Sequence, residues 1–440
     1  MKKNPSILER ELDFVASSKL RYNERFVRYL LMGMVADFDR ARQGIDYFAQ
    51  LSIEGKNEYS LKYSADASDQ EIFTFIYDLL NRIVMEKIES IDKTIPVTLG
   101  VSSGYDSRSI LLVLLKHNIP VITYTYGQLG NFDFDFSKML FKSLKRRNIF
   151  FDTSKFKWSL KSYEQGIFKF QDYPISPRVI TEQLLSDKYN RRYDLQGYLN
   201  DSLTGPRISS FGSDNWDLAI DNFCRANDQF KFQGLVSRDT LKFLLPEKPY
   251  FQPEILSLDR QLNFSFRQIQ RIRPVGGRGA TFITPFEDRR WVSFWLSRMS
   301  KDLEEQRFYL KFLNSLKENV FFDLKDKSTL ERTALKKYNI KSTYSGLKLI
   351  DKAYSKYMRN KKLPSKPGAH FCLYTCYCNN KSFRNMINES IGRLKKRKVF
   401  KEIFIDKIWM DFEKGDATAA AMLNGLVSTD ILIEVGVFDE

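Results

Sequence analysis

Apolar and polar residues follow regular patterns over the first third of the chain. Val97, Leu99 and Val101 occupy alternate positions after Pro96, a spacing typical of a β-strand. Residues 109–115 are too uniformly apolar for a surface helix, so they predict a helix buried against a sheet. Two more strands are predicted over 119–127 and 149–152, where β-branched and aromatic residues concentrate. A helix between the first two strands makes a right-handed βαβ unit with parallel strands.

Helical periodicity is clearest in residues 69–87, where apolar side chains recur every three or four positions. Asp69 is the expected N-cap of this helix. Residues 136–144 predict another helix, with Asp133 or Asp135 as its cap. Helices alternating with strands predict an α/β protein with a Rossmann-like parallel sheet flanked by helices.

The loop between the first strand and its helix consists of small and hydroxylated residues, Ser102-Ser103-Gly104-Tyr105-Asp106-Ser107. The first N–H groups of a helix have no internal acceptor, and the helix dipole places partial positive charge there. Such a loop binds anions, and the serine hydroxyls add donors. Asp106 repels a phosphate but can contact it through Mg²⁺. The loop therefore predicts a site for nucleotide phosphates with a metal ion, and an ordinary βα turn is the alternative.

The same loop resembles the S-G-G-x-D-S pyrophosphate loop of the N-type ATP pyrophosphatases, the PP-loop superfamily. With the apolar helix after it, the loop is most similar to the synthetase domain of the asparagine synthetases. The resemblance implies an adenine nucleotide α-hydrolase-like fold with ATP and Mg²⁺ as cofactors. It implies that the pyrophosphate part of ATP is bound by Ser102, Ser103, Gly104 and Ser107, and that Asp106 contacts the nucleotide through Mg²⁺. Ser103 stands where the family has its first glycine.

Thr125 and Tyr126 close the second predicted strand. Ligands of parallel α/β sheets bind beyond the carboxyl ends of the strands, so these two residues end near the same crevice as Ser102. By the resemblance they border the adenosine. Simple packing of Tyr126 at the end of the sheet is the alternative.

Residues 193–205 carry Gly197, Asp201 and Gly205 at the spacing of the family's G-x-x-x-D-x-x-x-G segment. By the resemblance, Asp201 joins Asp106 as the second Mg²⁺ ligand, since a magnesium triphosphate needs carboxylates from separate loops. A turn-rich surface loop is the alternative. Ser202 replaces the acidic residue that the family usually has after the aspartate.

Two further segments carry candidate cations. Residues 323–327 lie where the family has a lysine that neutralises pyrophosphate, so Lys325 and Lys327 are the candidate catalytic lysines, with solvated surface lysines as the alternative. Arg278 lies in the glycine-rich residues 274–279. A linker is favoured there over a mobile lid that carries the arginine to an anion.

Later segments of the domain are similar to structural elements of the family. Residues 284–296 look like its P-F-L-D segment and the helix after it, with Val292, Trp295 and Leu296 expected in the core. Residues 307–316 match the helix that the family places next.

Residues 370–378 bring together one imidazole and three thiols. The metal candidates are His370, Cys372, Cys376 and Cys378. Their spacing is not that of a standard zinc knuckle, and simple burial of the cysteines among aromatic residues is favoured over Zn²⁺ binding. The basic run 393–398 is interpreted as a solvated helix face, with an anionic partner as the alternative.

The composition indicates the kind of partner, the compartment and whether the chain spans a membrane. The 440 residues include 70 Lys and Arg against 54 Asp and Glu, so the net charge is +16, which favours anionic partners without choosing among them. Four cysteines fit a reducing compartment, and the N-terminus lacks the apolar region of a signal peptide. Without an apolar run of about 18 residues, we expect a cytoplasmic protein with no membrane span.

We divide the chain into three parts. Residues 1–69 have an uncertain fold, because the apolar run 26–35 suits a strand or a buried helix equally well. Residues 70–340 form the expected ATP-binding domain, and 341–440 a mostly helical C-terminal extension.

The N-terminus bears on the expected reaction. Full-length asparagine synthetases begin with a glutaminase domain whose nucleophilic cysteine follows the initiator methionine, whereas this chain has Lys2 there and its first cysteine is Cys224. Family members without that nucleophile include β-lactam synthetases and lasso peptide cyclases. The resemblance therefore implies an ATP-dependent carbon–nitrogen ligase of specialised metabolism, acting on a natural product, modified peptide or surface glycan. It would adenylate a carboxylate, release pyrophosphate and transfer the acyl group to an amine, with a partner protein as one source of ammonia or substrate.

Two other functions remain open. The net charge of +16 suits a relative that modifies tRNA by adenylating a base, although nucleic acid is not the favoured partner. Ser103 and Ser202 depart from the family pattern, which suits a degenerate domain kept as a nucleotide-binding or scaffold protein.

Overall fold

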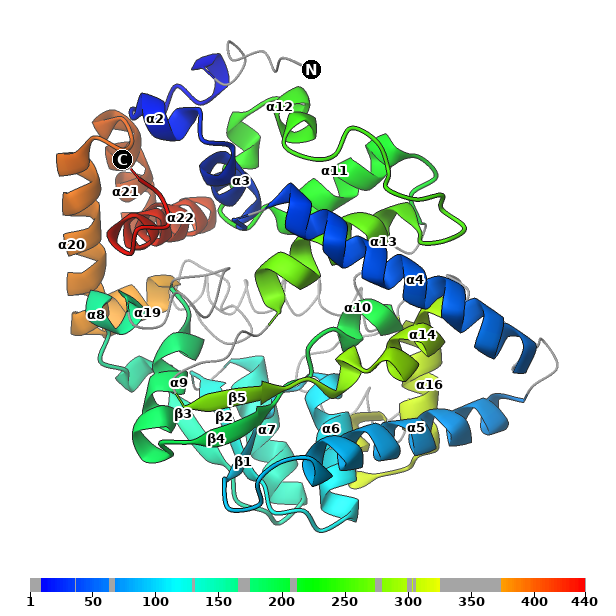
Figure 1. Ribbon diagram of the computed structural model, residues 1–440. Helices are drawn as coiled ribbons and strands as arrows, with labels where there is room; N and C mark the ends of the chain where they lie inside the picture. Colours follow the sequence, from blue (N-terminus) through cyan, green and yellow to red (C-terminus); the bar gives the residue numbers. More distant parts are fainter. Residues whose placement is uncertain are drawn as a thin grey trace.

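A computed structural model gives the fold. It describes residues 9–35, 37–62, 68–128, 131–164, 175–205, 212–273, 279–298, 303, 306–324 and 373–439. The protein is α/β, with one parallel sheet flanked by helices and a helical C-terminal part (Figure 1). The predicted fold class is confirmed.

The sheet has five parallel strands in the order β3-β2-β1-β4-β5. They are β1 (Val97–Gly100), β2 (Ile122–Gly127), β3 (Ile149–Asp152), β4 (Arg192–Leu195) and β5 (Ala280–Ile283). In the middle of the sheet, Thr98 of β1 lies opposite Ile122 of β2 on one side and Asp194 of β4 on the other. The order changes direction at β1, and ligands of open parallel sheets bind at such a point, beyond the carboxyl ends of the strands.

The three strands expected from the sequence are present, and the two that were not expected are short. β4 and β5 have four residues each, and β4 contains the charged residues Arg192 and Asp194. Both charges are buried and have partners from distant segments: Arg192 pairs with Glu182, and Asp194 accepts hydrogen bonds from Thr98 and Tyr124. A charged strand of this kind has no signature in local sequence.

Helices surround the sheet in this half of the molecule. They are α4 (Phe38–Lys62), α5 (Asp69–Glu89), α6 (Tyr105–Lys116), α7 (Phe132–Ser143), α9 (Pro177–Lys188), α10 (Asn200–Thr204), α14 (Arg289–Ser297) and α16 (Arg307–Ser315). The expected helices 69–87, 136–144 and 307–316 match α5, α7 and α16 within a few residues. Val292, Trp295 and Leu296 of α14 are buried, as expected.

Two expected helix caps are wrong. Asp69 lies inside α5, which is capped by Ser68 in a reciprocal capping box with Glu71. Asn131 holds the N-cap position of α7, and neither Asp133 nor Asp135 does. The carboxylate of Asp133 instead reaches a different loop, as described below.

The other half of the molecule is helical and joins both ends of the chain. It contains α2 (Ser18–Arg21), α3 (Glu24–Met32), α8 (Leu160–Glu164), α11 (Trp216–Asn227), α12 (Arg238–Phe243), α13 (Leu258–Leu262), the π-helix η4 (Asn263–Ile272), α19 (Leu373–Asn379), α20 (Lys381–Arg397), α21 (Glu402–Glu413) and α22 (Ala417–Glu434). Residues 26–35, which suited either strand or helix, are mostly helix α3. Figure 1 shows α3 beside α22.

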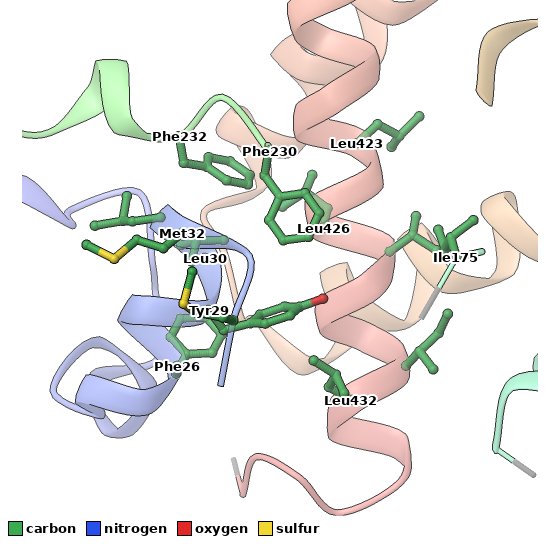
Figure 2. Packing of buried hydrophobic residues seen from close by; sticks show 14 of the residues in the cluster. Phe26, Tyr29, Leu30, Met32, Ile175, Phe230, Phe232, Leu423, Leu426 and Leu432 are labelled. Carbon is green, nitrogen blue, oxygen red and sulfur yellow. The ribbon is translucent and has the colours of Figure 1, made fainter. Parts of the chain in front are cut away.

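Aromatic and aliphatic side chains from three distant segments form the core of this helical half (Figure 2). Phe26 and Tyr29 of α3 face α22, and Phe230 and Phe232 cover the middle of that helix. Gly425 makes the approach possible, because a Cβ there would lie 2.6 Å from the ring of Phe232. The N-terminal and C-terminal segments therefore share one core. The boundaries at 69/70 and 340/341 stay predictions.

Charged residues near the C-terminus pair with each other. Arg393 and Arg397, within the basic run 393–398, form ion pairs with Asp430 and Glu434 of α22. This part of the run holds two helices together and is not simply a solvated face. Within the described ranges, none of the helices combines the length and apolar character needed to cross a membrane.

Candidate functional site

The serine-rich loop lies at the carboxyl end of the central strand. β1 ends at Gly100 and α6 begins at Tyr105, so residues 101–104 form the bend that the sequence predicted. Gly104 is the N-cap in extended backbone geometry and has no side chain to cap the helix. The N-cap residue therefore offers no side-chain acceptor to the N–H groups in the first turn of α6. These N–H groups and the positive end of the helix dipole together favour binding of an anion.

Hydrogen bonds within the protein fix the shape of this loop. The backbone N–H of Ser103 donates to Asp133 Oδ1 over 2.9 Å, and the Ser103 hydroxyl donates to the same oxygen. The Gly104 N–H donates to Ser102 Oγ over 3.1 Å, and Ser107 Oγ donates to the Gly104 carbonyl over 3.3 Å. Of the three serines expected to bind pyrophosphate, Ser103 thus has both its N–H and its hydroxyl bonded to Asp133.

The segment that carries Asp201 packs directly on the start of α6. After β4, the chain turns at Leu199, whose φ is 77°, and enters the short helix α10. Asn200, its first residue, donates from Nδ2 to Asp106 Oδ1 over 2.7 Å and accepts from Trp291 Nε1 over 2.9 Å. Asp201 follows in the same turn of α10. The two aspartates that the sequence singled out are therefore neighbours in space.

Two glycines of the G-x-x-x-D-x-x-x-G segment are required by close contacts. A Cβ at Gly197 would lie 2.8 Å from the Asp106 Cβ and 3.2 Å from the Ser107 N. Gly205 ends α10 with φ at 118°, and a Cβ there would lie 1.8 Å from the carbonyl oxygen of Leu303. Only glycine fits these positions, so the motif has a physical basis in this chain.

The charge of Asp201 acts on Asp106. The pKa of the Asp106 carboxyl is raised to about 7, mainly by burial and also by the Coulomb field of Asp201. The hydrogen bond from Asn200 opposes this shift. Two carboxylates that repel each other beside a helix N-terminus fit a divalent cation such as Mg²⁺, which takes oxygen ligands from one or two carboxylates and from phosphates. Asp106 and Asp201 are the residues that would hold it.

Protein side chains alone do not complete a metal site. Within the residues that the structure describes, no group of three or more His, Cys, Asp or Glu side chains is placed to hold a metal ion. Cys376 is buried in α19 and Cys378 is exposed, whereas His370 and Cys372 lie outside the described residues. Lys325, Lys327 and Arg278 also lie outside them.

Ser202, at the family's acidic position, has a structural role. Its side chain is buried, accepts hydrogen bonds from Asn263 and Gln268 of η4, and donates to Asp201 Oδ1 over 3.2 Å. A carboxylate in its place would lose this last bond and repel Asp201. The serine therefore links the turn that carries Asp201 to the π-helix.

Thr125 and Tyr126 lie at the end of β2, next to the loop, as predicted. The Thr125 hydroxyl donates to the Val101 carbonyl over 2.7 Å and accepts from Asn148 over 3.1 Å. Because this hydroxyl already donates inside the protein, it has no hydrogen left to donate to an adenosine. Tyr126 is partly buried.

A pocket lined by Tyr198 and Leu199, shortly before Asp201 in the chain, was not predicted from the sequence. It has a volume of about 560 Å³ and lies between α4, η4 and the end of β5. Tyr198, Arg273 and Glu287 line it, and the last two form an ion pair of 2.9 Å. Burial raises the pKa of Tyr198, and the negative charges of Glu287 and Asp201 contribute. The only sequence signal was Tyr198 inside the glycine-bounded segment and Glu287 after Pro285-Phe286, which we interpreted as structural.

Comparisons with known proteins do not place the chain in a family. No model of a known protein family matches the chain, and a search of the curated proteins finds no match either.

Proposed function

We propose that this protein is an ATP-dependent ligase that joins a carboxylate to an amine, with release of AMP and pyrophosphate. One observation carries the proposal: Asp106, in the first turn of α6 after β1, and Asp201, in α10 after β4, meet beside the N-terminus of α6. A magnesium triphosphate is the ligand class that uses a helix N-terminus for its phosphates and separate carboxylates for its metal. The resemblance of the loop to the PP-loop superfamily supports the same ligand.

The proposed reaction has two balanced steps. An oxygen of the substrate carboxylate forms a bond to the α-phosphorus of ATP, and the bond from that phosphorus to the bridging oxygen breaks, releasing pyrophosphate. The amine nitrogen then forms a bond to the acyl carbon, the bond to the AMP oxygen breaks, and one proton is released. Mg²⁺, when bound, neutralises charge on the phosphates.

The chain's own groups would act by position and charge. The first-turn N–H groups of α6 and the hydroxyl of Ser102 would donate to the pyrophosphate oxygens as negative charge develops on them. The Ser107 hydroxyl would join them by turning away from the Gly104 carbonyl, to which it donates in the structure. Asn200 holds Asp106 in place from the neighbouring turn. Fixing ATP and the substrate at one point lowers the entropic part of the barrier.

The pocket lined by Tyr198 and Leu199 is the proposed place for the carboxylate or the amine. Its wall combines the aromatic residues Tyr47, Phe48 and Phe282 with the charged residues Lys87, Arg273, Glu287 and Asp288. An apolar wall with a few charged groups is typical of small-molecule sites. Its volume of about 560 Å³ suits a small molecule or the end of a peptide.

Pyrophosphate release from ATP tests the proposal. The purified protein is incubated with Mg²⁺, ATP and a panel of amino acids, hydroxy acids and peptides, each with and without an amine. We expect one class of carboxylate to raise pyrophosphate release at least about tenfold over ATP alone, which corresponds to ~1.4 kcal/mol of barrier. Release raised by tRNA alone would favour a nucleic-acid substrate. The absence of both release and nucleotide binding would contradict the ligase and favour a scaffold.

A further inference from the structure

Asp133 holds the phosphate loop from one side. It lies in the first turn of α7 and is 5 % exposed. Its Oδ1 accepts both the backbone N–H of Ser103, at 2.9 Å, and the Ser103 hydroxyl. A carboxylate oxygen with two donors from one residue is a strong, charge-assisted anchor.

Arg108 holds the same loop from the other side. Its side chain is fully buried at 0 % exposure and lies over the rings of Tyr105 and Phe136, with the guanidinium carbon 4.5 Å and 4.7 Å from their centres. Its Nη2 donates to the Ser103 carbonyl over 2.7 Å, and its Nε to the Gly104 carbonyl over 3.4 Å. Nη1 donates to Val320, in η7 (Asn319–Leu324), over 3.0 Å. A buried cation is costly unless it is hydrogen-bonded, and Arg108 donates to three backbone carbonyls, two of them in the loop.

The planar peptide group between Ser103 and Gly104 links these contacts, so together they fix the conformation of the loop. Because the peptide group is planar and trans, the Ser103 carbonyl that faces Arg108 directs the Gly104 N–H to the opposite side. That N–H donates to Ser102 Oγ. The N–H, hydroxyl and carbonyl of Ser103 are thus all bonded within the protein.

We propose that Asp133 and Arg108 are positioning residues that pre-organise the phosphate loop, with Ser103 as its anchor. This inference depends on the ligase function proposed above. It also gives a reason for serine at the family's glycine position, since glycine has no hydroxyl to donate to Asp133. Ser103 then shapes the site, and the pyrophosphate contacts come from the start of α6, Ser102 and Ser107.

Loss of the anchor weakens nucleotide binding. Fixing the backbone of a loop costs conformational entropy, so a loop that must become ordered on binding loses affinity. For Asp133→Ala we expect the Kd of Mg²⁺–ATP to rise about ten- to a hundredfold. For Asp133→Asn, which keeps an oxygen acceptor for the Ser103 N–H, we expect a rise of less than about tenfold.

Calorimetric titration with Mg²⁺–ATP, together with melting temperatures, is the experiment. Asp135→Ala is the matched control, because Asp135 lies in the same first turn of α7 and is only partly buried. We expect that control to bind like the wild type. The double variant Asp133→Ala/Ser103→Ala should bind within about twofold of Asp133→Ala alone, since the Ser103 hydroxyl acts through Asp133.

The outcomes separate the positioning role from the proposed function. Wild-type protein that binds no Mg²⁺–ATP overturns both. Wild-type binding with an unchanged Kd in Asp133→Ala, even with a lower melting temperature, leaves the ligase intact and overturns the positioning role. If Asp133→Ala does not fold, Ser103→Ala decides: a rise in Kd of about threefold or more supports the anchor, and an unchanged Kd overturns it.

Discussion

Asp106→Asn should lower the rate of pyrophosphate release by at least about a hundredfold, because a metal ligand with several kcal/mol of charge stabilisation is lost. The melting temperature of the nucleotide-free variant should equal that of the wild type or exceed it. Burial and the charge of Asp201 both disfavour the ionised Asp106 carboxylate, and asparagine carries no charge. The asparagine oxygen can still accept the hydrogen bond from Asn200. A stability gain with loss of turnover is the pattern of a residue kept for function.

The rate of release and the melting temperature are measured on the same protein sample. Asp135→Asn is the control, and we expect wild-type values for it in both measurements. Undiminished turnover in Asp106→Asn would remove Asp106 from the mechanism. A fall in turnover together with a marked loss of melting temperature would instead indicate that Asp106 supports the fold.

Gly205→Ala should destabilise the protein by roughly 2–6 kcal/mol, from about 1–3 kcal/mol of backbone strain and about 1–3 kcal/mol of overpacking. The φ of Gly205 is 118°, a conformation that side chains rarely adopt. The added Cβ would also lie 1.8 Å from the Leu303 carbonyl oxygen, which is backbone and cannot rotate away. The free energy of unfolding of a typical protein is about 5–15 kcal/mol. A loss of this size therefore removes a large share of it.

Urea unfolding of Gly205→Ala and Gly234→Ala measures this effect. Gly234 has no neighbouring atom within 4 Å of an added Cβ, so its variant should unfold at the wild-type urea concentration or slightly above it. Equal midpoints for the two variants would mean that the chain around α10 relaxes freely.

Local patterns were sufficient for β1, β2, β3 and their helices, since alternate apolar positions and apolar runs depend only on neighbours in sequence. They failed for β4 because Asp194 and Arg192 are stabilised by partners far along the chain, among them Thr98, Tyr124 and Glu182. A buried charged strand becomes visible only when those partners are placed.

The candidate site, like the sheet, was predictable from the sequence only in part. The proximity of Asp106 and Asp201 was expected from a resemblance between short motifs, and the contact through Asn200 agrees with it. The role of Asp133 was not predictable, because an aspartate at the start of a helix is usually a cap. Its real partner, Ser103, is brought to it by the pairing of β1 with β2.

Titration of the wild-type protein with ATP, in the presence and absence of Mg²⁺, tests most directly whether Asp106 and Asp201 together hold a metal-bound triphosphate. We expect saturable binding with Mg²⁺, at least about tenfold weaker binding without it, and the same weakening in Asp201→Asn with Mg²⁺ present. Binding of ATP that is indifferent both to Mg²⁺ and to the Asp201→Asn substitution would contradict the proposed site.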